Sequence, residues 1–106
     1  MRNDKELTRL LDEARPLMPT SEHWAALGEE GAELCKAGLK MRRVLTQINR
    51  TPLTQDKALA DVLEELADVF NYIDLIGIRE EIGWMAEIEN IRKQKLRRMI
   101  FERYKQ

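Results

Sequence analysis

The sequence has few of the residues that build disulfide scaffolds, β-rich folds or membrane spans. Its single cysteine, Cys35, excludes an internal disulfide and a multi-cysteine zinc site. Five glycines and three prolines are few for a β-rich fold, and no alternating run of β-branched residues stands between turn signals. No stretch approaches the roughly 18 apolar residues of a membrane-spanning helix, and the charged N-terminus lacks a signal-peptide core. We therefore expect a helical, cytoplasmic protein with no membrane partner.

Charge is abundant but nearly balanced. Charged residues make up 35% of the chain, and 18 basic residues stand against 19 acidic ones, giving a net charge of −1. This balance does not suggest a general role at nucleic acids or membrane surfaces, so no stable nucleic-acid partner is expected. The length of 106 residues predicts a single domain over residues 1–106.

Apolar residues recur at helical spacing between a few clear breaks. Pro16 and Pro19 end a first helix, Pro52 breaks the chain again, and Thr54 can cap a third helix, within which Gly77 is an alternative earlier end. Helices are expected over residues 4–15, 20 to about 49, 55–81 and 84–104. The pattern predicts an all-α antiparallel bundle of about four helices, with the second and third packed against each other.

Two short acidic clusters are the most informative feature of the chain. They are Glu-Glu-Gly-Ala-Glu at residues 29–33 and Glu-Glu-Leu-Ala-Asp at residues 64–68. Spacing by three residues puts Glu30 with Glu33, and Glu65 with Asp68, on one face of a helix. The clusters stand at unequal distances from the break near Pro52, so a stagger or kink is expected to bring them level.

These carboxylates have two interpretations. Acidic runs on helices are usually a solvated face. Here, however, each cluster lies among apolar residues, and none of the four acids has a basic residue four positions later; Lys36, three after Glu33, is the nearest. Facing carboxylates would repel unless a cation lay between them, and oxygen-only ligands suit Mg²⁺ or Mn²⁺. A ferritin-type di-iron site is disfavoured because the single histidine, His23, follows no Glu at the required spacing.

The strings Leu-Gly-Glu-Glu-Gly-Ala-Glu-Leu at 27–34 and Glu-Glu-Leu-Ala-Asp-Val-Phe at 64–70 resemble the signature of the all-α nucleoside triphosphate pyrophosphohydrolases, the MazG-like family. The resemblance covers roughly residues 20–98. It implies hydrolysis of a nucleoside triphosphate between the α and β phosphates, giving a monophosphate and pyrophosphate, by water activated at one or more Mg²⁺ ions. The implied metal ligands are Glu30, Glu33, Glu65 and Asp68, with Glu29 as an extra ligand or base.

Other residues are candidates for substrate binding. The last helix is basic, and the resemblance implies a Lys and an Arg there that reach the phosphates. Lys95 and Arg98 share a face and are the first choice, with residues 92 and 93 as alternates; a solvated face is the competing interpretation. Asn71 could read a base or a sugar, and Trp24 could stack on a base, although both have ordinary structural roles as well. Cys35 is expected to be a small buried hydrophobe without a catalytic role.

A chain this short would leave apolar surface on both long helices, and small members of the resembled family pair their subunits. We therefore expect a homodimer or tetramer with an isologous interface that buries Leu and Met positions of the second to fourth helices. Two alternative functions stay open. One is a helical adaptor or oligomerisation module whose acids keep it soluble, and the other is a nucleotide-binding sensor of the same fold.

Overall fold

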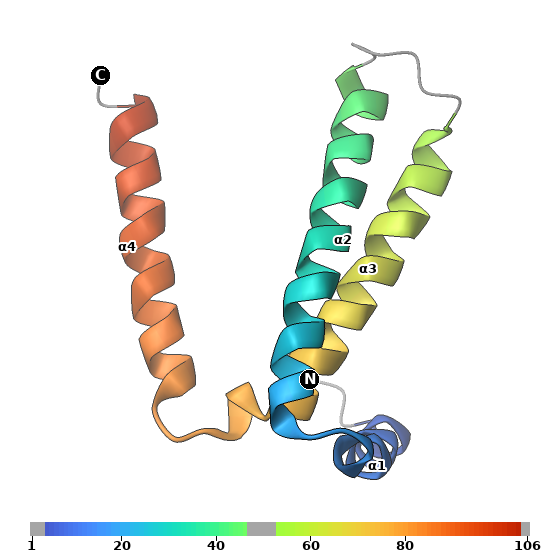
Figure 1. Ribbon diagram of the computed structural model, residues 1–106. Helices are drawn as coiled ribbons and strands as arrows, with labels where there is room; N and C mark the ends of the chain where they lie inside the picture. The colour runs from blue at the N-terminus through green and yellow to red at the C-terminus, as the bar shows by residue number, and fades with distance from the viewer. Residues whose placement is uncertain (1–3, 47–52, 105–106) are drawn as a thin grey trace. The chain divides into compact units, whose positions relative to one another are not determined.

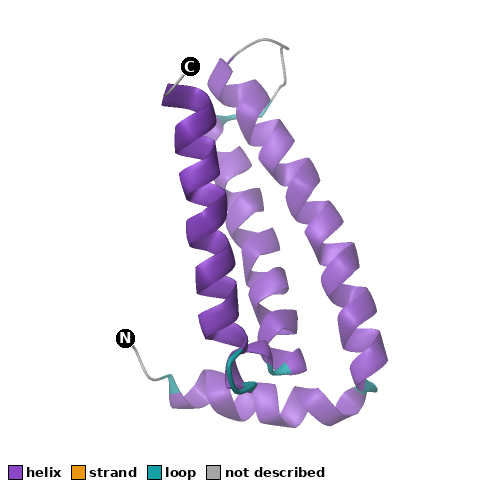
Figure 2. Ribbon diagram, turned by 90° about the vertical axis from the view of Figure 1, so that its left-hand side faces the viewer, coloured by secondary structure: helices purple, strands orange, loops and turns teal. Residues whose placement is uncertain are grey.

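The computed structural model describes residues 4–46 and 53–104, and within these ranges its regular secondary structure is helical, with no strand (Figure 2). The described elements are α1 (Lys5–Ala14), a 3-10 turn (Arg15–Leu17), α2 (Thr20–Thr46), α3 (Gln55–Ile76), a second 3-10 turn (Ile78–Glu80) and α4 (Trp84–Tyr104). The predicted all-α class is confirmed. No helix in the described ranges combines the length and apolarity that a membrane crossing needs.

The chain divides into two compact units, Met1–Ile76 and Gly77–Gln106. The first unit contains α1, α2 and α3, and the second contains the short turn and α4. The single domain expected from the length stays a prediction. The two units are described separately below.

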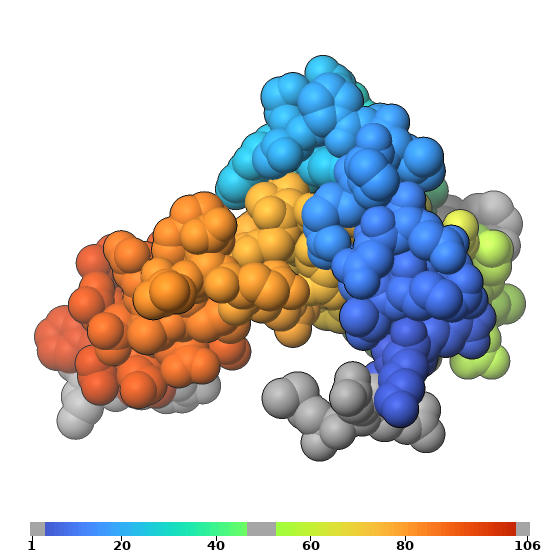
Figure 3. All heavy atoms as spheres, turned by 90° about the horizontal axis from the view of Figure 1, so that it is seen from below, coloured from blue at the N-terminus to red at the C-terminus, as the bar shows by residue number. Residues whose placement is uncertain are grey.

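The first unit is a long helical hairpin closed at one end by a short helix. Helices α2 and α3 run antiparallel and lie side by side, as the sequence predicted (Figure 1). Helix α1 crosses the end of the hairpin where α2 begins and α3 ends, and it packs against α3. Seen from below, atoms of α1 lie beside this end of the hairpin (Figure 3).

Short polar residues begin two of these helices. The Oδ1 atom of Asp4 accepts a hydrogen bond of 3.0 Å from the backbone N–H of Leu7, which satisfies a free donor in the first turn of α1. The hydroxyl of Thr54 accepts one of 3.2 Å from the backbone N–H of Lys57, so the predicted cap of α3 is confirmed. The predicted end of the second helix, near residue 49, lies outside the described residues.

Helix α3 ends five residues earlier than its apolar pattern predicted. Its last residue is Ile76 rather than Glu81, because Gly77 adopts the left-handed conformation with φ +86°. Glycine reaches this region without a Cβ clash and is a frequent helix terminator. The alternative break at Gly77 is therefore the correct one.

The interior of the structure is small. Among the described residues, Ala37 and Ala58 are the only buried apolar side chains, and His23 is the only buried polar one. Large side chains stay partly in water, including Trp24 at 47% and Leu39 at 50% exposure. The described residues thus leave much apolar surface without cover.

The expectation that Cys35 is buried is wrong. Its side chain is exposed. The reason is its place on the helix: it precedes the buried Ala37 by two residues, and so points about 200° away around α2. Because Ala37 faces α3, Cys35 lies on the opposite face of α2.

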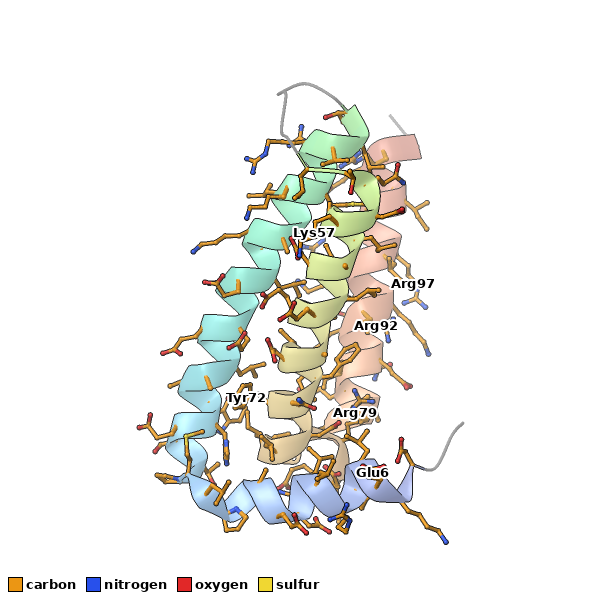
Figure 4. The ribbon with its side chains drawn as sticks, turned by 90° about the vertical axis from the view of Figure 1, so that its right-hand side faces the viewer. Glu6, Lys57, Tyr72, Arg79, Arg92 and Arg97 are labelled. Carbon is orange, nitrogen blue, oxygen red and sulfur yellow. The ribbon has the colours of Figure 1, made fainter. Side chains whose placement is uncertain are left out.

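The second unit is almost entirely one helix. Helix α4 begins at Trp84 and ends at Tyr104, as predicted, after Gly83 with φ +86°. Residues 86–103 are all exposed, and the basic side chains of Arg92 and Arg97 project from the helix (Figure 4).

Candidate metal centre

The packing of α2 on α3 follows one register over four helical turns. Seven-residue steps along α2 give His23, Glu30 and Ala37, and seven-residue steps along α3 give Ala58, Glu65 and Tyr72. In the pairs 23 with 72, 30 with 65 and 37 with 58, the two residue numbers add to 95. Residues seven apart share a helix face, so antiparallel helices in this register meet along these three levels. At the middle level, this register places Glu30 of α2 beside Glu65 of α3.

Three carboxyl groups meet at this level. One oxygen from each of Glu30, Glu65 and Asp68 lies within 4.8 Å of the other two, and all three residues are half-buried. Glu30 comes from α2, while Glu65 and Asp68 come from successive turns of α3. We call this group the acidic triad. The predicted convergence of the two sequence clusters is therefore present for three of its four principal members.

The triad concentrates negative charge. Partial burial of Glu30, then the charges of Asp68 and Glu65, raise the pKa of the Glu30 carboxyl above its ordinary value, and hydrogen bonds to both neighbours act in the same direction. None of the ion pairs found among the described residues includes a triad carboxylate. The crowding of negative charge thus favours a proton on Glu30, and three oxygens at this spacing could hold a cation.

A nearby acid shows the contrast. Asp61, two turns before Asp68 on α3, lies 3.0 Å from the ammonium of Lys57, which Figure 4 shows on the same helix. The hydrogen bond and the charge of Asp61 raise the pKa of Lys57. Asp61 is therefore neutralised from its own helix, whereas the triad carboxylates are not.

Glu33 and Glu29 lie outside the triad. The Oε1 atom of Glu33 is 3.3 Å from the ammonium of Lys36, and its side chain is 50% exposed. Three residues along a helix leave a rotation of about 60° from Glu30, which turns Glu33 toward Lys36 and water. Glu29 is exposed as well. Their roles as a fourth ligand and as an extra ligand or base stay predictions.

The candidate substrate-binding residues lie in three places. Asn71 is exposed and lines an open cavity of about 190 Å³ between α1 and α3, formed otherwise by Leu7, Leu10, Leu11, Ala14 and Leu75. Trp24 is half-exposed on α2. Lys95 and Arg98 are exposed on α4, in the second unit. Their contacts with a substrate stay predictions.

The structure also contains a link between helix ends that sequence reasoning missed. His23 is 2% exposed, and its Nε2 donates to the backbone carbonyl of Arg15 at 3.0 Å. Its ring lies 6.2 Å from that of Tyr72, which projects from α3 toward α2 (Figure 4). Arg15 in turn donates from Nε to the carbonyl of Leu75 at 3.1 Å and from Nη2 to that of Asp74 at 3.2 Å. The turn after α1 is thereby fastened to the last turn of α3.

This link sets the tautomer of a buried histidine. A carbonyl oxygen only accepts, so the Nε2 of His23 carries the proton, while Nδ1 is buried with no hydrogen-bond partner among the described residues. The hydrogen bonds from Arg15 join residues about 60 positions apart in the sequence, and no local sequence pattern predicts such contacts.

Comparison with known proteins adds no relative. No family model, no curated protein and no solved structure matches the chain. The resemblance to the MazG-like pyrophosphohydrolases therefore stays a prediction, which rests on the residues of the two strings at 27–34 and 64–70.

Proposed function

We propose that this chain is a Mg²⁺-dependent pyrophosphohydrolase that cleaves a nucleoside triphosphate, ribo or deoxy, at the α–β bond to a monophosphate and pyrophosphate. The proposal is carried by the acidic triad, in which carboxyl oxygens from two antiparallel helices lie within 4.8 Å of one another. None of the ion pairs of residues 4–46 and 53–104 includes a triad carboxylate. The same three residues belong to the two strings that resemble the MazG-like signature.

The donor set fits a hard dication. Glu30, Glu65 and Asp68 offer only carboxylate oxygens, which are the ligands that Mg²⁺ prefers and that Mn²⁺ also accepts. A bound ion would offset the charge of the triphosphate and supply a water of lowered pKa at neutral pH. The role of the triad residues would be to hold the ion at a fixed place between α2 and α3. Glu33 is the proposed fourth ligand, and Glu29 the proposed extra ligand or base.

Binding of the nucleotide is assigned to residues of several helices. Lys95 and Arg98 supply positive charge for the phosphates, and a guanidinium can hold two phosphate oxygens at once. Trp24, with 47% of its surface exposed, offers a face on which a base can stack. Asn71 offers both a donor and an acceptor for a base edge or a sugar hydroxyl.

Release of pyrophosphate is the direct test. The purified chain should release pyrophosphate and form the monophosphate from at least one member of a panel of ribo- and deoxyribonucleoside triphosphates, with Mg²⁺ and not with EDTA. Glu65→Gln and Asp68→Asn should each abolish turnover and keep the helical circular dichroism. Glu64→Gln is the matched control, because Glu64 is the exposed neighbour of Glu65 and lies outside the triad. Full activity in either triad variant, or no activity across the panel, would contradict the proposal.

A second candidate is a helical oligomerisation or adaptor module, which the extensive exposed apolar surface favours. A nucleotide sensor would share the triad without turnover. Thermal stabilisation by a nucleotide in the presence of Mg²⁺, without product formation, would identify a sensor, because only a ligand bound to the folded state raises its stability. An adaptor would show neither response. Under each of these functions we propose a homodimer or a tetramer.

A further inference from the structure

Two levels of the register between α2 and α3 flank the acidic triad. The alanine level, formed by Ala37 and Ala58, lies seven residues to one side of it. The aromatic level, formed by His23 and Tyr72, lies seven residues to the other side. At a rise of about 1.5 Å per residue, each level is about 10.5 Å from the triad along the helix axes. The side chains at these two levels therefore set how far apart α2 and α3 stand at the triad.

The alanine level permits a close approach of the two helices. Ala58 is 1% exposed and Ala37 is 6% exposed, so both methyl groups are covered where the helices meet. The distance between packed helix axes is about 8–10 Å and depends on the side chains at the contact. Two alanines allow the lower end of this range, because neither side chain extends beyond its Cβ. A larger side chain at this level would push α2 and α3 apart, since protein interiors are close-packed.

The aromatic level is held in place by side-chain contacts and hydrogen bonds. The ring of the buried His23 lies 6.2 Å from that of Tyr72, which Figure 4 labels. His23 bonds to the carbonyl of Arg15, and Arg15 donates to the carbonyls of Leu75 and Asp74 at the end of α3. These bonds fasten α2 to α3 at this end. The hairpin is therefore expected to pivot here when the spacing at the alanine level changes.

The acidic triad spans the gap between the two helices, which lie side by side (Figure 1). Its single carboxyl from α2, that of Glu30, meets two from α3, those of Glu65 and Asp68. An ion held by all three would have ligands on both sides of the gap. A wider gap at this level moves Glu30 away from the other two carboxyls. The helix spacing therefore limits the size of the ion that fits.

The expected widening matches the difference between two common dications. A larger residue at the alanine level can widen the helix spacing by up to about 2 Å, the span of common interaxial distances. Because the triad lies halfway between the pivot and the alanine level, roughly 1 Å of this reaches the carboxyls. Mg²⁺ binds oxygen at about 2.0–2.1 Å in a strict octahedron, and Ca²⁺ at about 2.3–2.6 Å in a flexible shell. Across two opposed bonds, the two ions therefore differ by about 0.4–1.2 Å.

We propose that Ala37 and Ala58 are positioning residues whose close contact sets the spacing of the triad carboxyls and makes the site select Mg²⁺ over Ca²⁺. The inference rests on the proposed function, since it concerns the ion of the same site. It goes further by assigning ion selectivity to two side chains that offer no ligand atom. Their influence on the ion can act only through the distance between α2 and α3.

The test measures the ion preference of the full chain, defined as the dissociation constant for Ca²⁺ divided by that for Mg²⁺. MgCl₂ and CaCl₂ are titrated separately at constant ionic strength by isothermal calorimetry, and thermal unfolding in each salt gives a second measurement. The wild type should bind Mg²⁺ more tightly. Ala58→Val should weaken Mg²⁺ binding about tenfold and change Ca²⁺ binding less than about threefold, because only Mg²⁺ demands the short, strict geometry. Ala37→Val should give the same shift from the opposite helix.

Two controls separate helix spacing from stability. Ala60→Val makes the same exchange at an exposed position of α3, and it should keep the ion preference within about twofold of the wild type. Ala58→Gly weakens the helix but keeps the close contact, so it should lower Tm in EDTA and leave the preference unchanged. Circular dichroism checks the fold of each variant. If the valine variants do not fold, Ala58→Ser, which adds one heavy atom, should lower the preference by a smaller factor.

The outcomes distinguish this inference from the function on which it rests. A wild-type chain that binds neither ion would overturn the proposed metal centre, and the positioning role with it. A wild type that binds both ions equally well would overturn the positioning role alone. So would enlarged variants at the alanine level that lower Tm but keep the wild-type preference, because that result would leave the two alanines with a role in packing only.

Discussion

Replacing Asp68 by asparagine should change the stability of the chain in opposite directions without and with magnesium. In EDTA, the change removes a negative charge whose oxygen lies within 4.8 Å of that of Glu65. Two unit charges at this distance repel by about 0.9 kcal/mol in water, and by less in salt. We therefore expect the free energy of unfolding of the metal-free chain to rise by about 0.5–1 kcal/mol.

With magnesium, the sign should reverse. An ion that binds only the folded state stabilises it by about 2.7 kcal/mol at a concentration 100 times its dissociation constant. For a unit of this size, that corresponds to a rise of about 10–20 °C in Tm. The Asp68→Asn variant would offer the ion a neutral amide oxygen in place of a charged carboxylate. A dissociation constant that is weaker by about tenfold or more removes about 1.4 kcal/mol of this gain or more.

The assay is thermal and urea unfolding followed by circular dichroism, in EDTA and over a series of MgCl₂ concentrations. NaCl keeps the ionic strength constant, which separates binding from screening of exposed charges. Glu64→Gln is the matched control, since it removes a neighbouring charge outside the triad. If the wild type gains no stability from Mg²⁺ at constant ionic strength, or if Asp68→Asn gains as much, the triad does not hold the ion.

Three further predictions concern single residues. Because the pKa of Glu30 is raised, the folded state binds a proton there more tightly than the unfolded state does. The free energy of unfolding of the metal-free chain should therefore fall as the pH rises from about 4.5 through the raised pKa. Glu30→Gln should flatten this pH dependence in urea unfolding measured from about pH 4 to 7. Arg15→Met should lower the free energy of unfolding by about 2 kcal/mol, because the variant loses the two hydrogen bonds to the end of α3. The control Arg9→Met loses only the exposed ion pair between Arg9 and Glu13 within α1, and it should lower the free energy of unfolding by less than about 0.5 kcal/mol. Equal effects of the two variants in urea unfolding would refute the link. Glu33→Gln should abolish pyrophosphate release with an unchanged fold, and near-normal activity would remove Glu33 from the ligand set.

Much of the fold follows from local chemistry that the sequence displays. The bounds of α4 agree with the prediction, and so does the cap at Thr54, because both depend on neighbouring residues. The end of α3 was predicted too late. The apolar pattern continues past Ile76, and only the left-handed conformation of Gly77 stops the helix.

The site was harder to predict because it depends on the register between two helices. The two acidic clusters lie at unequal numbers of residues from the break near Pro52, so the sequence alone does not place them opposite each other in the hairpin. In the observed register the residue numbers of each pair add to 95, and this makes Glu30 and Glu65 level within α2 and α3. The pairing of Glu33 with Lys36, and the burial of His23 beneath Arg15, depend on side-chain direction and on contacts between distant residues. The spacing of three residues allows the pair between Glu33 and Lys36 but does not decide it, and no local spacing predicts the burial of His23.

The small interior has a calorimetric consequence. Unfolding a typical domain raises the heat capacity by about 12–15 cal/mol/K per residue, mainly because apolar surface becomes hydrated. With Ala37 and Ala58 as its only fully covered apolar side chains among the described residues, the isolated chain should show a markedly smaller increment. If the proposed pairing of subunits covers the exposed apolar surface, dilution should flatten the peak and broaden the melting curve recorded in a scanning calorimeter, while concentrated samples should approach the usual value.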